Sequence, residues 1–203
     1  AHAINVALGN VSKTVIYTQP VEAEPAEQLS SLRDLVADMN AGKVNTLLIL
    51  GGNPVFDAPA DLAFAGSLNK VPLRIHLGLY EDETAELCHR HIPETHFLEA
   101  WSDAQAYDGT AGIIQPLIAP LYGGKSAHEI LTVFSGQPDR SGHDIVKAFW
   151  QGRQPGDGFE QAWRKFLHDG VIAGATPPSK PVVLKKDFAT ALDAPKQARG
   201  LEI

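Results

Sequence analysis

A glycine-rich turn is the first feature of the chain that could support chemistry. Gly51-Gly52-Asn53-Pro54 directly follows the apolar run 47–50. Backbone N–H groups in such a turn can cradle a phosphate or pyrophosphate. The alternative is a tight turn after a strand, in which glycine supplies a positive φ and asparagine tolerates the left-handed conformation. The residues alone leave both interpretations open.

A second feature is a local concentration of potential metal ligands, formed by Cys88, His89, His91 and His96. Cysteine and histidine are favoured ligands of zinc and copper, and His89 and His91 would share one face of a strand. The spacing matches no standard metal-binding pattern. The alternative is a short strand that packs against a neighbouring subunit, so the sequence assigns no metal site.

Three carboxylates, Glu99, Asp103 and Asp108, form a third group that could be imagined in acid–base catalysis. A structural role is the alternative, because Glu99 follows an apolar pair and a buried carboxylate needs hydrogen-bonding partners in any case. Ser126 is better explained as a helix cap than as a nucleophile. No residue is therefore assigned as catalytic.

Composition excludes several classes of protein. The 203 residues carry a net charge of −7, which argues against nucleic acid as a partner. The single cysteine excludes an internal disulfide and an iron–sulfur cluster held by four cysteines of this chain. No apolar run reaches the roughly 18–20 residues of a membrane helix, so no direct membrane insertion is expected. The chain begins with Ala1 and opens on helix-like residues, and we expect it to be a fragment of a longer protein.

The elements that must position these residues follow from hydrophobic periodicity. The pattern predicts strands at 14–18, 44–50 and 73–79, and helices at 29–39, 62–68 and 81–88. This alternation predicts a parallel α/β sheet with right-handed crossovers. The strand 44–50 lacks alternation, so helices are expected on both faces. Ligands of open α/β sheets bind at the carboxyl edge, where the run 51–54 would lie.

The second half of the chain is predicted to be less regular. Residues 102–125 are rich in glycine and proline and are expected to form a long loop. Trp101, Tyr107 and Tyr122 in or beside this loop could pack on a partner or on the domain itself. Helices are predicted at 126–134, 144–151 and 159–168. The expected division is an α/β domain at 1–170 and an extended segment at 171–203, with an edge strand at 181–184 and a flexible tail.

Six short motifs follow one another along the chain: Gly51–Pro54, Glu83-Thr84-Ala85, Ile92-Pro93, Phe97-Leu98-Glu99, Asp108-Gly109 and Gln115-Pro116. This series, within residues 44–135, resembles the molybdopterin oxidoreductases of the dimethyl-sulfoxide-reductase superfamily. The resemblance implies a Rossmann-like domain with a parallel sheet flanked by helices. It also implies a cofactor site, vestigial or weak, at Gly51, Gly52, Asn53, Pro54, Glu83 and Thr84.

One branch of the family is a closer match, on the segments 5–10, 98–103 and 115–121. These are similar to the molybdopterin-oxidoreductase-like region of the large iron–sulfur subunit of bacterial alternative complex III, a quinol oxidoreductase. In that branch the region is a relic without its metal cofactor, and the iron–sulfur clusters lie elsewhere in the protein. The resemblance implies, as partners, other subunits of a membrane-bound respiratory complex, peripheral on the periplasmic face of the inner membrane.

Departures from the family pattern support the interpretation that this domain is a relic without its cofactor. Where active members carry Gln-Asp at the end of the third strand, this chain has Leu77-Gly78, which offers no carboxylate to a guanine. Cys88-His89 replaces the usual Ala-Asp, and no residue can be assigned as a molybdenum ligand. We therefore expect a cofactor-free scaffold domain of an electron-transfer complex, without catalysis of its own. The alternatives are a molybdopterin-guanine-dinucleotide-binding domain of a catalytic molybdenum oxidoreductase, or a stand-alone nucleotide-binding module.

Overall fold

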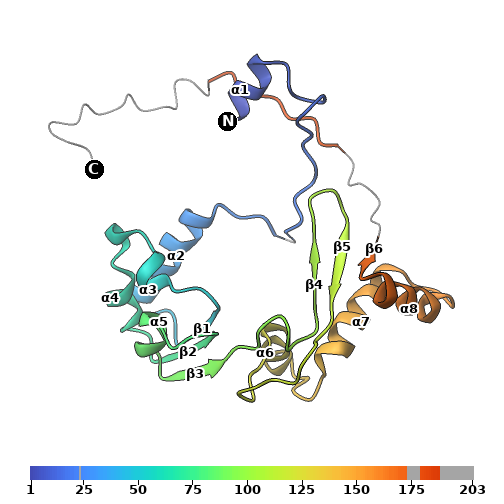
Figure 1. Ribbon diagram of the computed structural model, residues 1–203. Coiled ribbons are helices and arrows are strands. Elements are labelled where there is room, and N and C mark those ends of the chain that lie inside the picture. Colours follow the sequence, from blue (N-terminus) through green and yellow to red (C-terminus); the bar gives the residue numbers. More distant parts are fainter. Residues whose placement is uncertain (23, 173–178, 188–203) are drawn as a thin grey trace.

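The structure is a computed structural model that describes residues 1–22, 24–172 and 179–187. Two groups of elements make up most of the chain (Figure 1). The first group contains a three-stranded parallel sheet, and the second contains a three-stranded antiparallel sheet. In the described ranges no helix is long and apolar enough to cross a membrane.

The parallel sheet has the order β1-β2-β3, formed by β1 (Thr46–Leu50), β2 (Leu73–Gly78) and β3 (Arg90–Pro93). Leu50 pairs with Leu77 and Gly78 pairs with Pro93, so the carboxyl ends of all three strands meet at one edge. The connections contain α2 (Gln28–Asn40) before β1, then α3 (Pro54–Asp57), a 3-10 turn η1 (Ala60–Leu62) and α4 (Phe64–Leu68), and finally α5 (Glu83–Glu86). The predicted parallel α/β unit flanked by helices is confirmed.

One face of this sheet packs on α2 and α4. Met39 and Leu68 are almost completely buried there, and Leu47 and Ile49 of β1 contact the same cluster. On the opposite face the coverage is only partial, because Leu50 and Leu73 are exposed. The expectation that helices cover both faces of β1 is therefore not met at its carboxyl end.

The antiparallel sheet has the order β4-β5-β6, formed by β4 (Ser102–Gln105), β5 (Ala111–Ile114) and β6 (Val171–Ile172). It packs with α6 (Ala127–Phe134), α7 (Gly142–Arg153) and α8 (Phe159–Asp169). Trp150 of α7 and Trp163 of α8 are buried against Ile113 and Ile172 in a second hydrophobic core. Trp150 Nε1 also donates to Asp103 Oδ2 at 2.9 Å, which ties α7 to β4.

The long loop expected at 102–125 is wrong for residues 102–114, which form the β4–β5 hairpin, whereas residues 115–125 contain no helix or strand. The turn is closed by the Ala106 N–H, which donates to Thr110 O at 2.8 Å, and Gly109 supplies a φ of 88°. Asp108 Oδ1 accepts the Thr110 N–H at 2.9 Å. Asp-Gly between strand-like residues is a standard hairpin signal, and it was present in the sequence.

Two predicted strands are also wrong. At 14–18 no strand forms: residues 10–15 make a tight turn, in which Asn10 O accepts N–H groups from Lys13, Thr14 and Val15. At 181–184 no strand forms; the described tail has only an isolated bridge between Thr18 and Ser179. Proline at 181 has no N–H to donate to a ladder. The short helix α1 (His2–Ala7) precedes this region, and Figure 1 shows that it lies beside the described tail.

The predicted domain boundary at residue 170 stays a prediction. Gly170 ends α8 in the left-handed conformation, as its sequence position suggested. The next two residues, however, form β6, and Ile172 is buried in the second core. The flexible tail expected after residue 185 lies mostly outside the described residues.

Candidate functional site

The carboxyl edge of the parallel sheet is built around the turn after β1. The Gly51 N–H donates to Leu77 O at 2.7 Å, which continues the pairing of β1 with β2 into the turn. Gly51 and Gly52 then take φ values of 66° and 73°, which explains why both are glycines. Pro54 occupies the first turn of α3, where its missing N–H is not needed.

Side chains of α5 hold this turn from the neighbouring connection. Asn53 Nδ2 donates to Glu83 Oε2 at 2.6 Å, and the Thr84 hydroxyl donates to Asn53 Oδ1 at 2.7 Å. The Val55 N–H donates to Thr84 Oγ1 at 3.1 Å, and Thr84 is completely buried. The structure therefore brings the predicted site residues together, but their side chains bond to one another.

The Asn53 hydrogen bond also holds the Glu83 carboxylate in its charged form. This bond, and a weaker contribution from its own backbone N–H, lower the pKa of Glu83 below the ordinary value. The carboxylate is at the surface and is already used as an acceptor. A charged Glu83 disfavours an approaching phosphate, since like charges repel.

His76 of β2 is the central residue of the edge, and the sequence did not identify it. The side chain is 1 % exposed, with Nε2 3.2 Å from Gly52 O and Nδ1 3.2 Å from His91 Nδ1. A carbonyl oxygen can only accept, so Nε2 carries the proton in the first bond. The signal that could have found it was a histidine at the centre of the strand-like run 73–79, two residues after Arg74.

The imidazole of His76 occupies the space in which a side chain at residue 78 would begin. A Cβ built on Gly78 would lie 2.5 Å from Cε1 of His76 and 3.0 Å from Nε2. Both residues are buried, so the ring has little room to turn away. The space beside residue 78, where the resemblance implies a guanine-binding aspartate in active members, is therefore filled by another residue of the same strand.

Two acidic residues complete the surroundings of His76. Asp82 Oδ1 lies 3.9 Å from His76 Nδ1 and accepts the Ala85 N–H at the start of α5. Glu94 follows β3, and its N–H donates to Gly78 O at 2.9 Å. Burial raises the pKa of Glu94, and the nearby His76 partly opposes this. Neither acid was identified from the sequence.

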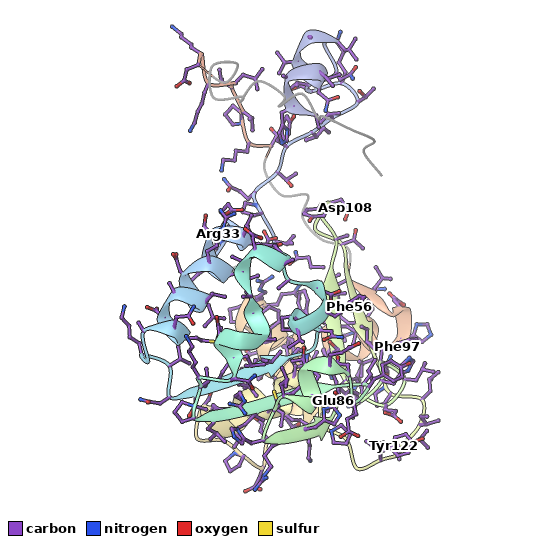
Figure 2. The ribbon with its side chains drawn as sticks, turned by 90° about the vertical axis from the view of Figure 1, so that its left-hand side faces the viewer. Arg33, Phe56, Glu86, Phe97, Asp108 and Tyr122 are labelled. Atoms are coloured by element: carbon purple, nitrogen blue, oxygen red, sulfur yellow. The ribbon has the colours of Figure 1, made fainter. Side chains whose placement is uncertain are left out.

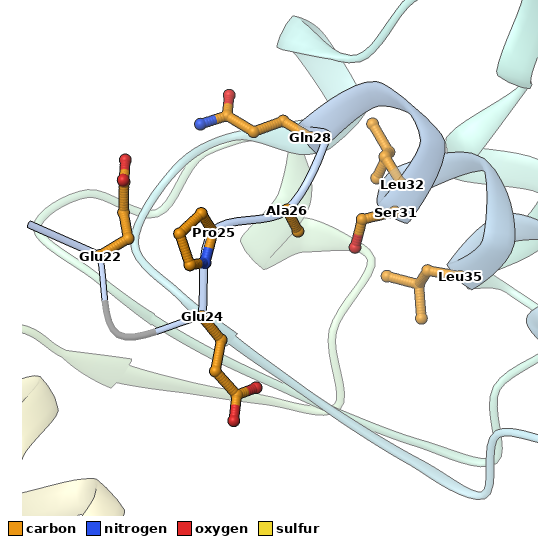
Figure 3. Close-up of a pocket in the computed structure, with 8 residues that line it drawn as sticks. All are labelled: Glu22, Glu24, Pro25, Ala26, Gln28, Ser31, Leu32 and Leu35. Carbon is orange, nitrogen blue, oxygen red and sulfur yellow. The ribbon is translucent and has the colours of Figure 1, made fainter. Parts of the chain in front are cut away.

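Two hollows could hold a ligand in this part of the molecule: one lies at the sheet edge, and the other lies at the start of α2. One, of about 370 Å³, is lined by the turn itself, from Gly51 to Pro54, and by Leu32 of α2. The other is shown in Figure 3 and lies between Glu22, Glu24 and the first turns of α2. Leu32 lines both, but the second hollow offers two acidic side chains and lies away from the strand ends. The first is therefore the better candidate for a ligand site.

The four potential metal ligands are not gathered into one site. His89 Nδ1 accepts the Arg74 N–H at 3.1 Å, His96 Nδ1 accepts the Leu98 N–H at 3.3 Å, and His91 faces His76. Burial raises the pKa of Cys88, which disfavours the thiolate that binds metals. The described residues contain no group of three or more His, Cys, Asp or Glu side chains that could hold a metal ion.

The three carboxylates considered for acid–base chemistry serve separate local roles. Glu99 accepts backbone N–H groups of Leu121 and His96, which lower its pKa. Asp103 accepts from Trp150, and the Thr110 N–H lowers the pKa of Asp108 at the hairpin tip. Figure 2 shows Asp108 at that tip, away from the parallel sheet. These bonds favour a structural role for the three carboxylates over a role in acid–base catalysis.

Comparison with known proteins adds two findings. No family model matches the chain. A menaquinone reductase, molybdopterin-binding-like subunit from Nitratidesulfovibrio vulgaris is 27% identical over 151 residues, which cover 66% of this chain and 22% of that protein. The chain thus spans about a fifth of the length of this relative.

The second finding concerns the fold. Acetylene hydratase from Pelobacter acetylenicus superposes with a TM-score of 0.53 and 16% identity. The superposition covers 70% of this chain and 20% of that one, and at this identity it speaks for the fold alone. The partial sequence match and the shared fold together confirm the resemblance of this chain to the molybdopterin oxidoreductase family.

Proposed function

We propose that the chain is a cofactor-free scaffold domain of a molybdopterin-oxidoreductase-like subunit. The observation that carries this proposal is the position of His76. Its ring fills the place of a side chain at residue 78 and its Nε2 bonds to Gly52 O, so the site edge is closed by the chain itself. A guanine-binding carboxylate at residue 78 would require His76 to leave a buried position.

The hydrogen bonds of the turn support the same proposal. Asn53 uses its amide nitrogen on Glu83 and its amide oxygen on Thr84, and Thr84 in turn accepts from Val55. A turn that kept a ligand would be expected to present such groups outward. Here they are satisfied internally, as in a structural turn.

The assignment of the domain to a larger complex rests on the family resemblance. We propose that the domain belongs to a respiratory quinol oxidoreductase of the alternative complex III type, peripheral on the periplasmic face of the inner membrane. Other subunits of that complex are its proposed partners, and iron–sulfur clusters in other parts of the same protein would carry the electrons. The relative is named as a subunit of a menaquinone reductase, and this name supports the proposed assignment to a respiratory complex.

A titration with guanosine diphosphate, the nucleotide end of the cofactor, tests the proposal. We expect isothermal titration calorimetry to detect no saturable binding up to millimolar nucleotide, with Mg²⁺ present or absent. Adenosine diphosphate serves as the matched control for nonspecific phosphate contacts. Saturable binding that prefers guanosine over adenosine would favour the alternative, a molybdopterin-guanine-dinucleotide-binding domain of a catalytic enzyme.

A further inference from the structure

A separate cavity of about 430 Å³ lies between the end of β3 and the first turn of α6. It shares no lining residue with the hollow beside Gly51–Pro54. Its walls come from both groups of elements, namely the segment after β3, the start of β4 and the beginning of α6. A cavity of this size is within the range of small-molecule sites.

The segment that carries Thr95, beside the cavity, is held by backbone pairing. The Thr95 N–H donates to Lys125 O at 3.1 Å, and the Lys125 N–H donates to Pro93 O at 2.9 Å. A Cβ on Gly124 would lie 3.0 Å from Pro93 O, so this close approach needs glycine. The cavity is therefore formed by fixed backbone, which lowers the ordering entropy that a ligand must overcome.

One wall residue has an unsatisfied polar group. Thr95 is 9 % exposed, and its Oγ1 has no hydrogen-bond partner among the described residues. A buried hydroxyl without a partner costs roughly 1–3 kcal/mol. Native proteins tolerate few such groups, and each calls for an explanation. The hydroxyl is covered in the free chain, but Thr95 lines the adjoining cavity, so a turn of its side chain toward a ligand atom there would supply the missing partner.

The other polar groups around the cavity are mainly donors. The N–H groups of Ala127 and His128, in the first turn of the eight-residue helix α6, have no acceptor among the described residues, while the capping box uses those of Ser126 and Glu129. Helix N-termini favour anions. The His96 ring uses Nδ1 as an acceptor, which leaves Nε2 to donate.

Apolar side chains, two of them aromatic, form much of the remaining wall. Trp101, Phe97 and Ile114 line the cavity, and Trp101 is half-buried. Glu94 also lines it and would oppose an anion. Its carboxylate, however, reaches toward the glycine turn, with Oε2 3.8 Å from the position of a Cβ on Gly51. The α6 end of the cavity is therefore the end suited to negative charge.

We propose that this cavity binds a small carboxylic acid with a flat apolar body. The carboxylate would accept from the Thr95 hydroxyl and the first turn of α6, and the apolar body would lie against Trp101. This site is independent of the cofactor site at the glycine turn. Its test therefore succeeds or fails separately from the guanosine diphosphate titration.

Phenylacetate is a suitable probe, with phenylacetamide and benzylamine as uncharged and cationic counterparts of the same shape. We expect saturable binding of phenylacetate to the 203-residue chain in calorimetry, and binding of the two counterparts at least about tenfold weaker, because a bond to a charged group is worth about 1.5–3 kcal/mol. Thr95→Val should weaken phenylacetate binding about tenfold by the same reasoning. Thr46→Val, at an exposed position on the far edge strand, should leave it unchanged.

Circular dichroism melting of both variants verifies that each one is folded. Absence of saturable phenylacetate binding would overturn the proposal. So would equal binding of the wild type and a folded Thr95→Val variant, or a preference for benzylamine over phenylacetate.

Discussion

At the scale of single residues, the proposed loss of guanine binding rests on the contact between His76 and Gly78. The sequence showed that the aspartate was missing at residue 78. It did not show that a neighbour on the same strand fills the vacated space. That fact depends on the side-chain direction of His76 and on the turn at Gly51-Gly52, which brings Gly52 O within 3.2 Å of the ring.

Gly78→Ala tests this contact. The added methyl group meets the buried imidazole, so we expect a loss of about 1–3 kcal/mol in the free energy of unfolding, as for other overpacked sites. In a His76→Ala background the ring is absent, and the same substitution should then have little effect. Urea denaturation of the four proteins measures this coupling. Equal effects of Gly78→Ala in both backgrounds would show that His76 does not occupy the space.

Asn53→Ala tests whether the hydrogen bonds of Asn53 with Glu83 and Thr84 form as described. Since the Asn53 amide is the main cause of the lowered pKa of Glu83, its removal should raise that pKa toward the ordinary value. A lowered carboxylate pKa stabilises the fold above the unfolded-state pKa of about 4.3, and this stabilisation is lost as the pH falls through the folded pKa. The variant should therefore lose less stability on acidification than the wild type.

NMR titration of the glutamate carboxyl carbons measures the shift directly. Glu27 is an internal control, because hydrogen bonds from Ser30 lower its pKa at a distant helix cap. Its titration should be identical in both proteins. An unchanged titration of Glu83 in Asn53→Ala would contradict the bonding scheme.

At the scale of elements, the sequence predicted the parts with strong periodicity and missed those that depend on local turns. The helices α2, α7 and α8 follow apolar stripes, and β1 and β2 follow β-branched or leucine-rich runs, so each was predicted within a few residues. The β4–β5 hairpin was missed because its strands are only four residues long and β4 consists mainly of polar residues. Its Trp150–Asp103 bond joins residues far apart in sequence, which no local pattern reveals.

The capping box of α6 was predicted from sequence and gives a prediction for this element. Ser126 Oγ accepts the Glu129 N–H, and Glu129 accepts the Ser126 N–H at 2.9 Å. Ser126→Ala should therefore lower the free energy of unfolding by about 1 kcal/mol. Ser31→Ala, at an exposed position within α2, should change it by less than about 0.5 kcal/mol. Urea denaturation compares the two, and equal small effects would show that the cap does not stabilise the domain.

At the scale of the whole molecule, we predict that the exposed apolar side chains of the segment 117–122 form a surface for a partner. Leu117, Leu121 and Tyr122 are each more than two-thirds exposed, although the segment is anchored at Leu98 O and Glu99. Figure 2 shows Tyr122 on the same side of the molecule as Phe97, which is also exposed. Apolar surface of this kind marks interaction sites.

Amide hydrogen exchange in the free chain and in the assembled complex tests this surface. We expect slower exchange across 117–122 in the complex. The amides of the β4–β5 ladder should be protected in both states, because their hydrogen bonds are internal. If 117–122 exchanges equally in both states, this segment does not contact a partner.

The cofactor content of the protein, purified as its host cell makes it, tests the central claim most directly. Pterin fluorescence after acid oxidation and molybdenum by mass spectrometry are measured on the same sample, beside an active molybdenum oxidoreductase as the positive control. With His76 filling the space at residue 78 and the glycine turn closed on Glu83 and Thr84, we predict neither pterin nor molybdenum above background. Pterin and molybdenum in stoichiometric amounts would contradict the scaffold proposal.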